Sequence, residues 1–569
     1  MVKRVFNLLN REFKNINQAA IVLGFFTLLS QVLALFRDRM FAHYLGPSAS
    51  LDIYYASFKI PDLLFVSVAS LASITVLLPF LVQKLGVKED GDINESNNSA
   101  RKLLSDIFTV FISVMILVSI IIFVLMPKLA PLVAPGFGTN EIKELVMLSR
   151  IMLLSPIFLG LSNMLGSVTQ MFKKFFVFAL SPVFYNLGII FGIVFFYPIF
   201  GVEGLAVGVV LGAFLHLAIQ LPTLKNKKFL PKVSFDIDWR EIRRITALSL
   251  PRTFGLALTS FSIIVITAIA SKIGVGSISL FQFSYNLQNV PLGIIGVSYA
   301  VAAFPTLARF YSGSNMEEFI KHISLAARQI IFWSMPAMFL FIVLRAQIVR
   351  VILGTGAFSW DATRLTAAAL ALFSISIVGQ SLILLFTRGY YAAGNTKKPL
   401  IINLFSTIIT IILSFVLVDI FKNYDVVKYF FESLLRINDV AHTEIVMLPL
   451  AFSVGSIINA FWLWIEFRSD FKIKKPFILK SFFQSFAGAF FMGYVSYVFL
   501  DIFDEVFNIN TFWGIFGQGF CAGFIGIVSG VAVLVLLKNQ ELKNVWYGIK
   551  NSKLFGSRVV GSSQEEIHS

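Results

Sequence analysis

The chain has 569 residues, of which 57% are hydrophobic and 14% are charged, and its mean hydropathy is +0.82. So few charges cannot cover the surface of soluble domains, whereas lipid solvates such a chain, and we therefore predict an all-α polytopic membrane protein. The single cysteine, Cys521, excludes an internal disulfide and a cysteine-rich metal site.

Sequence motifs for metal or nucleotide chemistry are missing. Neither an HExxH pair nor a Gly-rich phosphate loop with its lysine occurs in the chain. We therefore expect no metal site, no cofactor, no catalytic residues and no ATP-driven pump.

Apolar segments long enough to cross the membrane recur along the whole chain. A helix needs about 20 residues to cross the hydrocarbon core. The basic N-terminal flank has no small-residue cleavage site before the first segment, so we interpret it as a retained flank and not as a signal peptide. We predict fourteen segments, near residues 18–42, 53–83, 103–126, 144–171, 176–198, 201–224, 245–271, 278–308, 323–344, 366–393, 399–421, 445–467, 481–500 and 512–537.

Lysine and arginine gather in the N-terminal flank, the even-numbered connections and the C-terminal tail. The connections after segments five and thirteen contain neither residue, and the longest one, near 422–444, is expected to carry a short surface helix. Because cytoplasmic loops carry the basic excess, both termini are expected in the cytoplasm. The net charge of +16 then reflects topology and attraction to anionic lipid headgroups, and we expect no nucleic-acid partner.

Charged residues interrupt the first two apolar segments. Charge inside such a segment is costly and persists mainly where it faces a partner, water or a polar substrate. The alternative is that Arg37 and Asp38 only mark the wet end of a helix, but Lys59 and Asp62 repeat the pattern in the next segment. The residues concerned are Arg37, Asp38, Arg39, Asp52, Lys59 and Asp62.

Two short motifs recur six segments apart. Pro182-Val-Phe-Tyr-Asn-Leu opens segment five and Pro399-Leu-Ile-Ile-Asn-Leu opens segment eleven, while Pro79-Phe-Leu and Pro305-Thr-Leu close segments two and eight. A repeat of six segments predicts two pseudo-symmetric six-helix lobes in the same orientation, plus two extra helices. The expected parts are a cytoplasmic amphipathic flank (1–17), an N-lobe (18–224), a basic cytoplasmic linker (225–244), a C-lobe (245–467), segments thirteen and fourteen (468–537) and a disordered cytoplasmic tail (538–569).

Proline and glycine inside the segments allow bends. Proline frees a backbone carbonyl and permits a kink, and glycine permits close packing. We expect Pro61, Pro251, Pro291 and Gly293 to act as hinges, with static kinks as the alternative.

A series of motifs, in order over about residues 25–410, resembles the MurJ/MviN family. These proteins are lipid II flippases of the multidrug/oligosaccharidyl-lipid/polysaccharide exporter superfamily. The matching residues are Ser30-Gln31-Val32-Leu33-Ala34, Arg37-Asp38, Gly46, Asp52, Phe58-Lys59-Ile60-Pro61-Asp62-Leu63-Leu64, Ala134-Pro135-Gly136-Phe137, Val290-Pro291-Leu292-Gly293, Phe304-Pro305, Gly356-Ala357-Phe358 and Tyr390 to Pro399.

The chain departs from the family where charges line the central cavity. The family's arginine after the opening serine is Gln31 here, and the charged residues of segment eight stand as Tyr285, Asn286 and Asn289. Arg252, beside Pro251, is a further candidate from the C-lobe. We expect substrate to bind at Arg37, Lys59, Arg252, Asn286 and Asn289, within a cavity network of Gln31, Asp38, Arg39, Asp52 and Asp62.

The resemblance implies a flippase and not an enzyme. It would move a polyprenyl-diphosphate-linked peptidoglycan precursor, similar to lipid II, across the bacterial cytoplasmic membrane by alternating access, for cell-wall biosynthesis. Arginine would bind the phosphates bidentately and lysine as a point charge. The expected partners are the lipid-linked glycan, membrane lipids and either a coupling cation or the membrane potential, and the protein is expected to be a monomer.

Three alternatives remain open from the residues. The chain could move another lipid-linked oligosaccharide, export drugs with a coupled cation as other members of the superfamily do, or serve as a non-transporting scaffold for envelope assembly. A buried acidic residue at a cation site would favour the exporter, with Asp52 and Asp62 as candidates.

Overall fold

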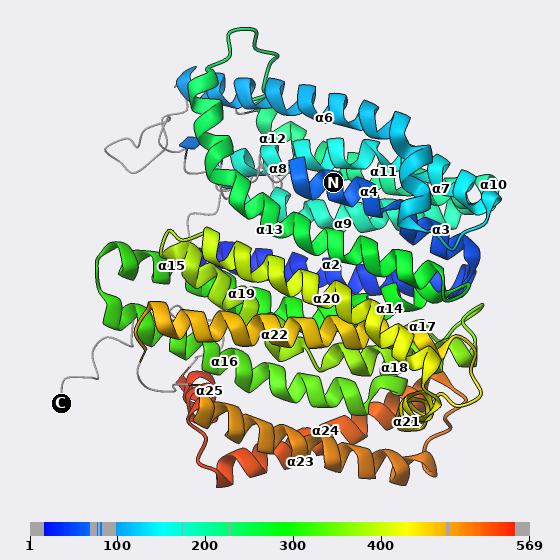
Figure 1. Cartoon of the computed structure of the whole chain (residues 1–569). Coiled ribbons are helices and arrows are strands. Elements are labelled where there is room, and N and C mark those ends of the chain that lie inside the picture. The colour runs from blue at the N-terminus through cyan, green and yellow to red at the C-terminus, as the bar shows by residue number, and fades with distance from the viewer. Residues whose placement is uncertain are drawn as a thin grey trace, which may run out of the picture. The chain divides into compact units, whose positions relative to one another are not determined.

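The computed structural model describes residues 16–68, 77, 80–81, 98–172, 174–226, 229–473 and 478–551, and every regular element in these ranges is a helix (Figure 1). The predicted all-α membrane fold is thereby confirmed. Nearly all of the flank at 1–17, Pro79, part of segment two and the tail beyond residue 551 lie outside the described residues.

Within the described residues, eleven helices are long and apolar enough to cross a membrane. A twelfth span is α18 (Trp360–Ser374) with α19 (Ile377–Ala392), which meet at a bend of 44° where the sequence predicts one continuous segment. These twelve match predicted segments three to fourteen, and the 29-residue α2 (Ile16–Tyr44) covers segment one. The predicted total of fourteen is not confirmed.

The contacts divide the chain into two compact units. Unit 1 comprises Met1–Leu287, Ile352–Ala369 and Thr396–Gly455, and unit 2 comprises Gln288–Val351, Leu370–Asn395 and Ser456–Ser569. The N-lobe and C-lobe boundaries taken from the sequence repeat stay a prediction.

Unit 1 contains the helices of the N-lobe and parts of the following segments. Its elements, beside α2 and part of α18, are α3 (Ala49–Ser57), α4 (Lys59–Val68), α6 (Asn98–Val133), α7 (Thr139–Met152), α8 (Leu154–Met171), α9 (Phe175–Phe191), the π-helix η2 (Gly192–Phe196), α10 (Tyr197–Phe200), α11 (Val202–Ala218), α12 (Leu221–Asn226), α13 (Trp239–Ser271), most of α14 (Ser277–Pro291), α20 (Lys397–Asn423), α21 (Asp425–Leu435), the 3-10 helix η4 (Thr443–Val446) and the start of α22 (Met447–Asp470).

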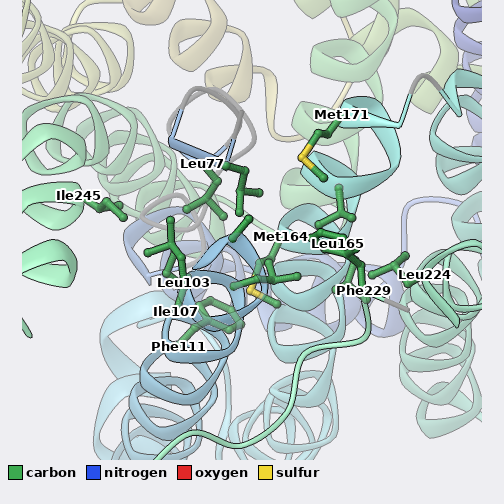
Figure 2. Packing of buried hydrophobic residues seen from close by; sticks show 14 of the residues in the cluster. Leu77, Leu103, Ile107, Phe111, Met164, Leu165, Met171, Leu224, Phe229 and Ile245 are labelled. Atoms are coloured by element: carbon green, nitrogen blue, oxygen red, sulfur yellow. The ribbon is translucent and has the colours of Figure 1, made fainter. Parts of the chain in front are cut away.

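A hydrophobic cluster holds one end of unit 1 together. Leu103, Ile107 and Phe111 repeat at helical spacing along α6, so they share one face, and they point toward Met164 and Leu165 of α8 (Figure 2). Burial of such side chains stabilises the fold by about 1.5–3 kcal/mol each. The cluster therefore holds α6 against α8.

Corresponding segments of the predicted repeat make similar pairs within unit 1. Segment one, α2, packs against segment five, α9, and segment seven, α13, packs against segment eleven, α20. Segments five and eleven carry the recurring Pro-x-x-x-Asn-Leu motif. Equivalent segments therefore make equivalent contacts.

Two glycine loops make reciprocal contacts at the ends of α2 and α13. The Gly136 amide donates to Ser271 Oγ over 3.1 Å, and the Ala357 amide donates to the His43 carbonyl over 3.0 Å. A side chain at Gly136 would overlap the backbone of Ser271, and one at Gly356 would overlap that of His43. We call these two junctions the reciprocal loop contacts.

Unit 2 contains the remaining helices. Its elements, beside the ends of α14 and α22 and most of α19, are the π-helix η3 (Leu292–Val297), α15 (Ser298–Ser312), α16 (Met316–Val343), most of α17 (Arg345–Leu353), α23 (Leu479–Asp504), α24 (Phe512–Leu536) and α25 (Gln540–Asn551). The helices α23 and α24 run side by side and α23 also packs on α16 (Figure 1).

Two local expectations have direct outcomes, whereas the hinge roles of Pro291 and Gly293 stay a prediction. The short surface helix near 422–444 is present as α21. The tail was expected to be disordered, which is wrong for residues 540–551, because they form α25. Pro291 ends α14 and Gly293 lies in the π-helix that follows, and this wider turn accommodates the missing proline amide.

Candidate functional site

Pro61 places Lys59 and Asp62 by breaking a helix. Proline cannot donate to the carbonyl four residues earlier, and the helix is interrupted at Phe58 between α3 and α4. The Ser57 carbonyl instead accepts a hydrogen bond from Ser149 Oγ over 3.3 Å. The side chain of Lys59 is thereby buried, whereas Asp62 stays exposed.

Arg37 and Asp38 form a charge-assisted pair inside unit 1. Arg37 Nε and Nη2 both donate to Asp38 Oδ1, at 3.0 and 2.8 Å, and Nη1 donates to Asn186 Oδ1 at 3.2 Å. A guanidinium has five N–H donors, so these three bonds leave two of them. The Arg37 side chain is 19% exposed and that of Asp38 is 4% exposed. The cation is therefore held in place while keeping donors for a ligand.

A chain of hydrogen bonds joins this pair to Lys59. Asn286 Nδ2 donates to Asp38 Oδ2 over 2.9 Å, Gln282 Nε2 donates to Asn286 Oδ1 over 2.8 Å, and Lys59 Nζ donates to Gln282 Oε1 over 3.0 Å. Gln282 and Asn286 are four residues apart on α14 and so share one face.

The chain continues beyond Arg37 on the other side. Asn186 Nδ2 donates to Ser30 Oγ over 3.2 Å. We call the seven connected side chains the polar relay: Ser30, Arg37, Asp38, Lys59, Asn186, Gln282 and Asn286.

A pocket of about 130 Å³ lies beside the relay. Tyr55 lines the pocket, and its buried hydroxyl has no hydrogen-bond partner among the described residues. The pocket thus combines two cations with neutral donors and one carboxylate. Its lining residues are Arg37, Phe41, Tyr54, Tyr55, Phe58, Lys59, Asp62, Tyr185, Ile189, Gln282 and Asn286.

Asp52 lies apart from this pocket and caps a helix. Its Oδ2 accepts from the Gly276 amide at 2.7 Å, and its Oδ1 accepts from the Ser279 amide and hydroxyl at 2.8 and 2.7 Å. A carboxylate at the N-terminus of α14 satisfies its free amides and complements the helix dipole. Asp52 therefore anchors α14, which carries Gln282 and Asn286.

The other predicted residues lie outside the pocket lining. Arg39 Nη1 donates to the Ile352 carbonyl over 3.2 Å, and Asn289 Oδ1 accepts from Gln288 over 3.2 Å. Gln31 Oε1 is buried without a hydrogen-bond partner in the described part of the chain. Pro251 and Arg252 lie in α13, but their side chains are outside the described residues.

Sequence reasoning missed Asn186, Gln282 and Tyr55 as site residues. Asn186 was visible as the asparagine of the recurring motif, which was used only to find the repeat. Gln282 gave a weaker indication, a polar residue four positions before Asn286 in an apolar segment. For Tyr55 no pattern was available.

The comparison with protein families shows which family the chain belongs to. The family model described as "Lipid II flippase MurJ" matches residues 41–517. The chain belongs to the MurJ family. The resemblance found in the sequence motifs is thereby confirmed.

MurJ relatives match along most of their own length. A probable lipid II flippase MurJ of Buchnera aphidicola is 26% identical over 84% of this chain and 88% of its own. The lipid II flippase MurJ of Burkholderia cenocepacia is also 26% identical, over 80% of this chain and 84% of its own. Such relatives place the chain among multi-pass bacterial inner-membrane proteins.

Solved structures show the same fold. A lipid II flippase MurJ in an inward closed conformation matches with a TM-score of 0.71 at 22% identity, covering 92% of this chain and all of the other. An inward-facing multidrug resistance MATE family transporter of the MOP superfamily matches with a TM-score of 0.62 at 15% identity, covering 78% of this chain and 96% of the other. The MurJ fold is thus shared with exporters of other cargo.

Proposed function

We propose that the protein is a flippase for lipid II, a polyprenyl-diphosphate-linked peptidoglycan precursor, and that it moves this lipid across the bacterial inner membrane. Membership of the MurJ family supports the substrate class. The observation that carries the proposal in this chain is that Arg37 and Lys59, from different helices, line one pocket. We further propose a monomer with both termini in the cytoplasm.

The relay residues suit the physical task of the transporter. A diphosphate cannot cross the low-dielectric membrane core without polar partners, because removing an ion from water costs several kcal/mol or more. The free donors of Arg37 and the ammonium of Lys59 replace part of its hydration shell. Asp38 balances Arg37 while the site is empty, which lowers the cost of keeping a cation in the membrane.

Headgroup entry requires a conformational change. The pocket of about 130 Å³ is smaller than the ~300–1,000 Å³ sites that hold drug-sized ligands, and a diphosphate with its sugars is at least as large as such a ligand. We propose that the reciprocal loop contacts open and close as the site alternates between the two sides of the membrane. Alternating access of this kind is the general mechanism of transporters with repeated halves.

Translocation of lipid II by proteoliposomes tests the proposal. Arg37→Ala and Lys59→Ala should each lower the rate at least tenfold, because each removes a phosphate partner. Lys321→Ala is the matched control, since Lys321 is an exposed lysine paired with Glu318 at 2.9 Å. Equal rates for all three variants and the unaltered chain would refute the site assignment.

A second candidate is coupling to a cation through Asp62. Its carboxylate lines the pocket and is attracted by Lys59, but no described side chain lies within hydrogen-bond or salt-bridge distance of it. A Na⁺ or proton would supply a direct contact and thereby link transport to an ion gradient. In Asp62→Asn, transport should persist without its dependence on a Na⁺ or pH gradient, and an unchanged dependence would exclude this role.

A further inference from the structure

A basic pocket of about 280 Å³ lies in unit 2, whereas the polar relay belongs to unit 1. It forms where α23 begins and where α24 passes into α25, with α16 closing one side. None of its residues has a part in the proposed transport site. They are Arg328, Lys480, Ser481, Gln484, Lys538, Gln540, Glu541 and Lys543.

Hydrogen bonds fix the backbone around this pocket. Asn539 is buried, and its Oδ1 accepts from the Leu542 amide over 2.9 Å, which caps α25. Asn539 Nδ2 donates to Gln484 Oε1 over 3.1 Å, and Gln484 Nε2 donates to the Leu537 carbonyl over 2.8 Å. The turn between α24 and α25 is therefore held in one conformation by hydrogen bonds, with Lys538 in the left-handed region at φ 51°.

The charges in the pocket are unbalanced. Its one carboxylate, Glu541, lies 3.5 Å from Arg328 Nε and is already paired. Lys480, Lys538 and Lys543 form no ion pair with any described residue. Like charges gathered in a partly enclosed space repel one another unless an anion binds between them.

A buried hydroxyl in the same pocket also has no partner. Ser481 is 3% exposed, and its Oγ forms no hydrogen bond with the described residues. A buried hydroxyl without a partner is unfavourable, so a ligand acceptor here would stabilise the pocket. Three lysines around one free hydroxyl match the oxygens of a phosphate group.

The helix α25 indicates where that phosphate comes from. Glu541, Leu542 and Val545 lie on its more buried side, whereas Trp546 and Tyr547 are exposed. Exposed Trp and Tyr beside basic residues are typical of helices that lie in the membrane interface. The pocket at the start of this helix would therefore lie at the level of the lipid headgroups, and a phosphate bound there would belong to a lipid.

We propose that this pocket binds the phosphate headgroup of an anionic phospholipid. The three lysines bind the phosphate oxygens, Ser481 donates a hydrogen bond, and α25 lies along the interface beside the bound lipid. Basic pockets between membrane helices bind such headgroups in this way. The proposal does not depend on the identity of the transported substrate.

Native mass spectrometry of the full-length protein tests the site. Protein exchanged into phosphatidylglycerol should retain the lipid, and protein exchanged into phosphatidylcholine should not. The triple variant Lys480→Gln, Lys538→Gln, Lys543→Gln should weaken phosphatidylglycerol retention at least tenfold. The control triple variant Arg309→Gln, Lys321→Gln, Lys472→Gln loses the same charge outside the pocket and should retain the lipid.

A further variant and a competitor complete the test. Ser481→Asp places a carboxylate against the phosphate and should also weaken retention at least tenfold, while Lys543→Gln alone should give a two- to threefold loss if the triple variant fails to fold. Millimolar inorganic phosphate should not displace the lipid. Equal retention by the two triple variants, equal retention of both lipids, or displacement by phosphate would each overturn the proposal.

Discussion

At the scale of single residues, the sequence predicted that Arg37 and Asp38 have polar surroundings but not that they bond each other. Two charges in a membrane segment indicate a polar surrounding, and Arg37 does line a pocket while Asp38 is paired with that arginine. Neighbours in a helix do not normally face each other, so their spacing did not predict the bonds at 2.8 and 3.0 Å. These bonds form because the Arg37 side chain turns back toward Asp38, and the conformation of that side chain depends on its tertiary contacts.

Arg37→Lys tests whether geometry or charge matters at this position. Lysine keeps the positive charge but cannot bond Asp38 and Asn186 together in the fork that arginine provides. Translocation should fall about tenfold while the protein remains folded, as measured in proteoliposomes and by thermal melting. If Arg37→Lys transports at the original rate, charge alone would be enough and the relay geometry would be irrelevant.

Asp52→Ala tests the anchoring role assigned to this carboxylate. Loss of a buried cap with three hydrogen bonds should lower the free energy of unfolding by about 2 kcal/mol. Asp52→Asn keeps one acceptor oxygen and should cost less. The melting temperatures of both variants give the check, and a stable Asp52→Ala protein without transport would instead indicate a role in the cavity.

At the scale of elements, the recurring Pro-x-x-x-Asn-Leu motif lies on two helices that make corresponding contacts. Asn186 and Asn403 occupy the same place in segments five and eleven, whose helices α9 and α20 pack on α2 and α13. The break between α18 and α19 was not predicted, because that stretch contains no proline. The bend of 44° coincides with Ser374 and Ser376, whose hydroxyls donate to the carbonyls of Leu370 and Phe373. Serine bonds of this kind to the preceding turn often bend a helix.

The reciprocal loop contacts make a prediction at this scale. Cysteines at His43 and Ala357, in a Cys521→Ser background, should form a disulfide under mild oxidation, because the Ala357 amide contacts the His43 carbonyl. If these contacts must open during transport, the cross-link should stop translocation and a reductant should restore it. Cross-linked protein that still transports would show that this junction does not move.

At the scale of the whole molecule, composition and periodicity were enough for the fold class, and ordered motifs were enough for the family. The polar relay was only partly predictable: Arg37, Asp38, Lys59 and Asn286 carry unusual charge or polarity for their place. Gln282 and Asn186 join them only through the packing of four distant segments. A single sequence contains no information on such pairings.

The account's central claim is that Arg37 and Lys59 act together on one lipid-linked diphosphate. The most direct measurement is lipid II translocation by proteoliposomes that contain Arg37→Ala, Lys59→Ala or the double variant. Because both cations line the same pocket, the double variant should be no more than a few-fold slower than the slower single variant. Losses that multiply fully, or single variants that transport at the original rate, would contradict the claim.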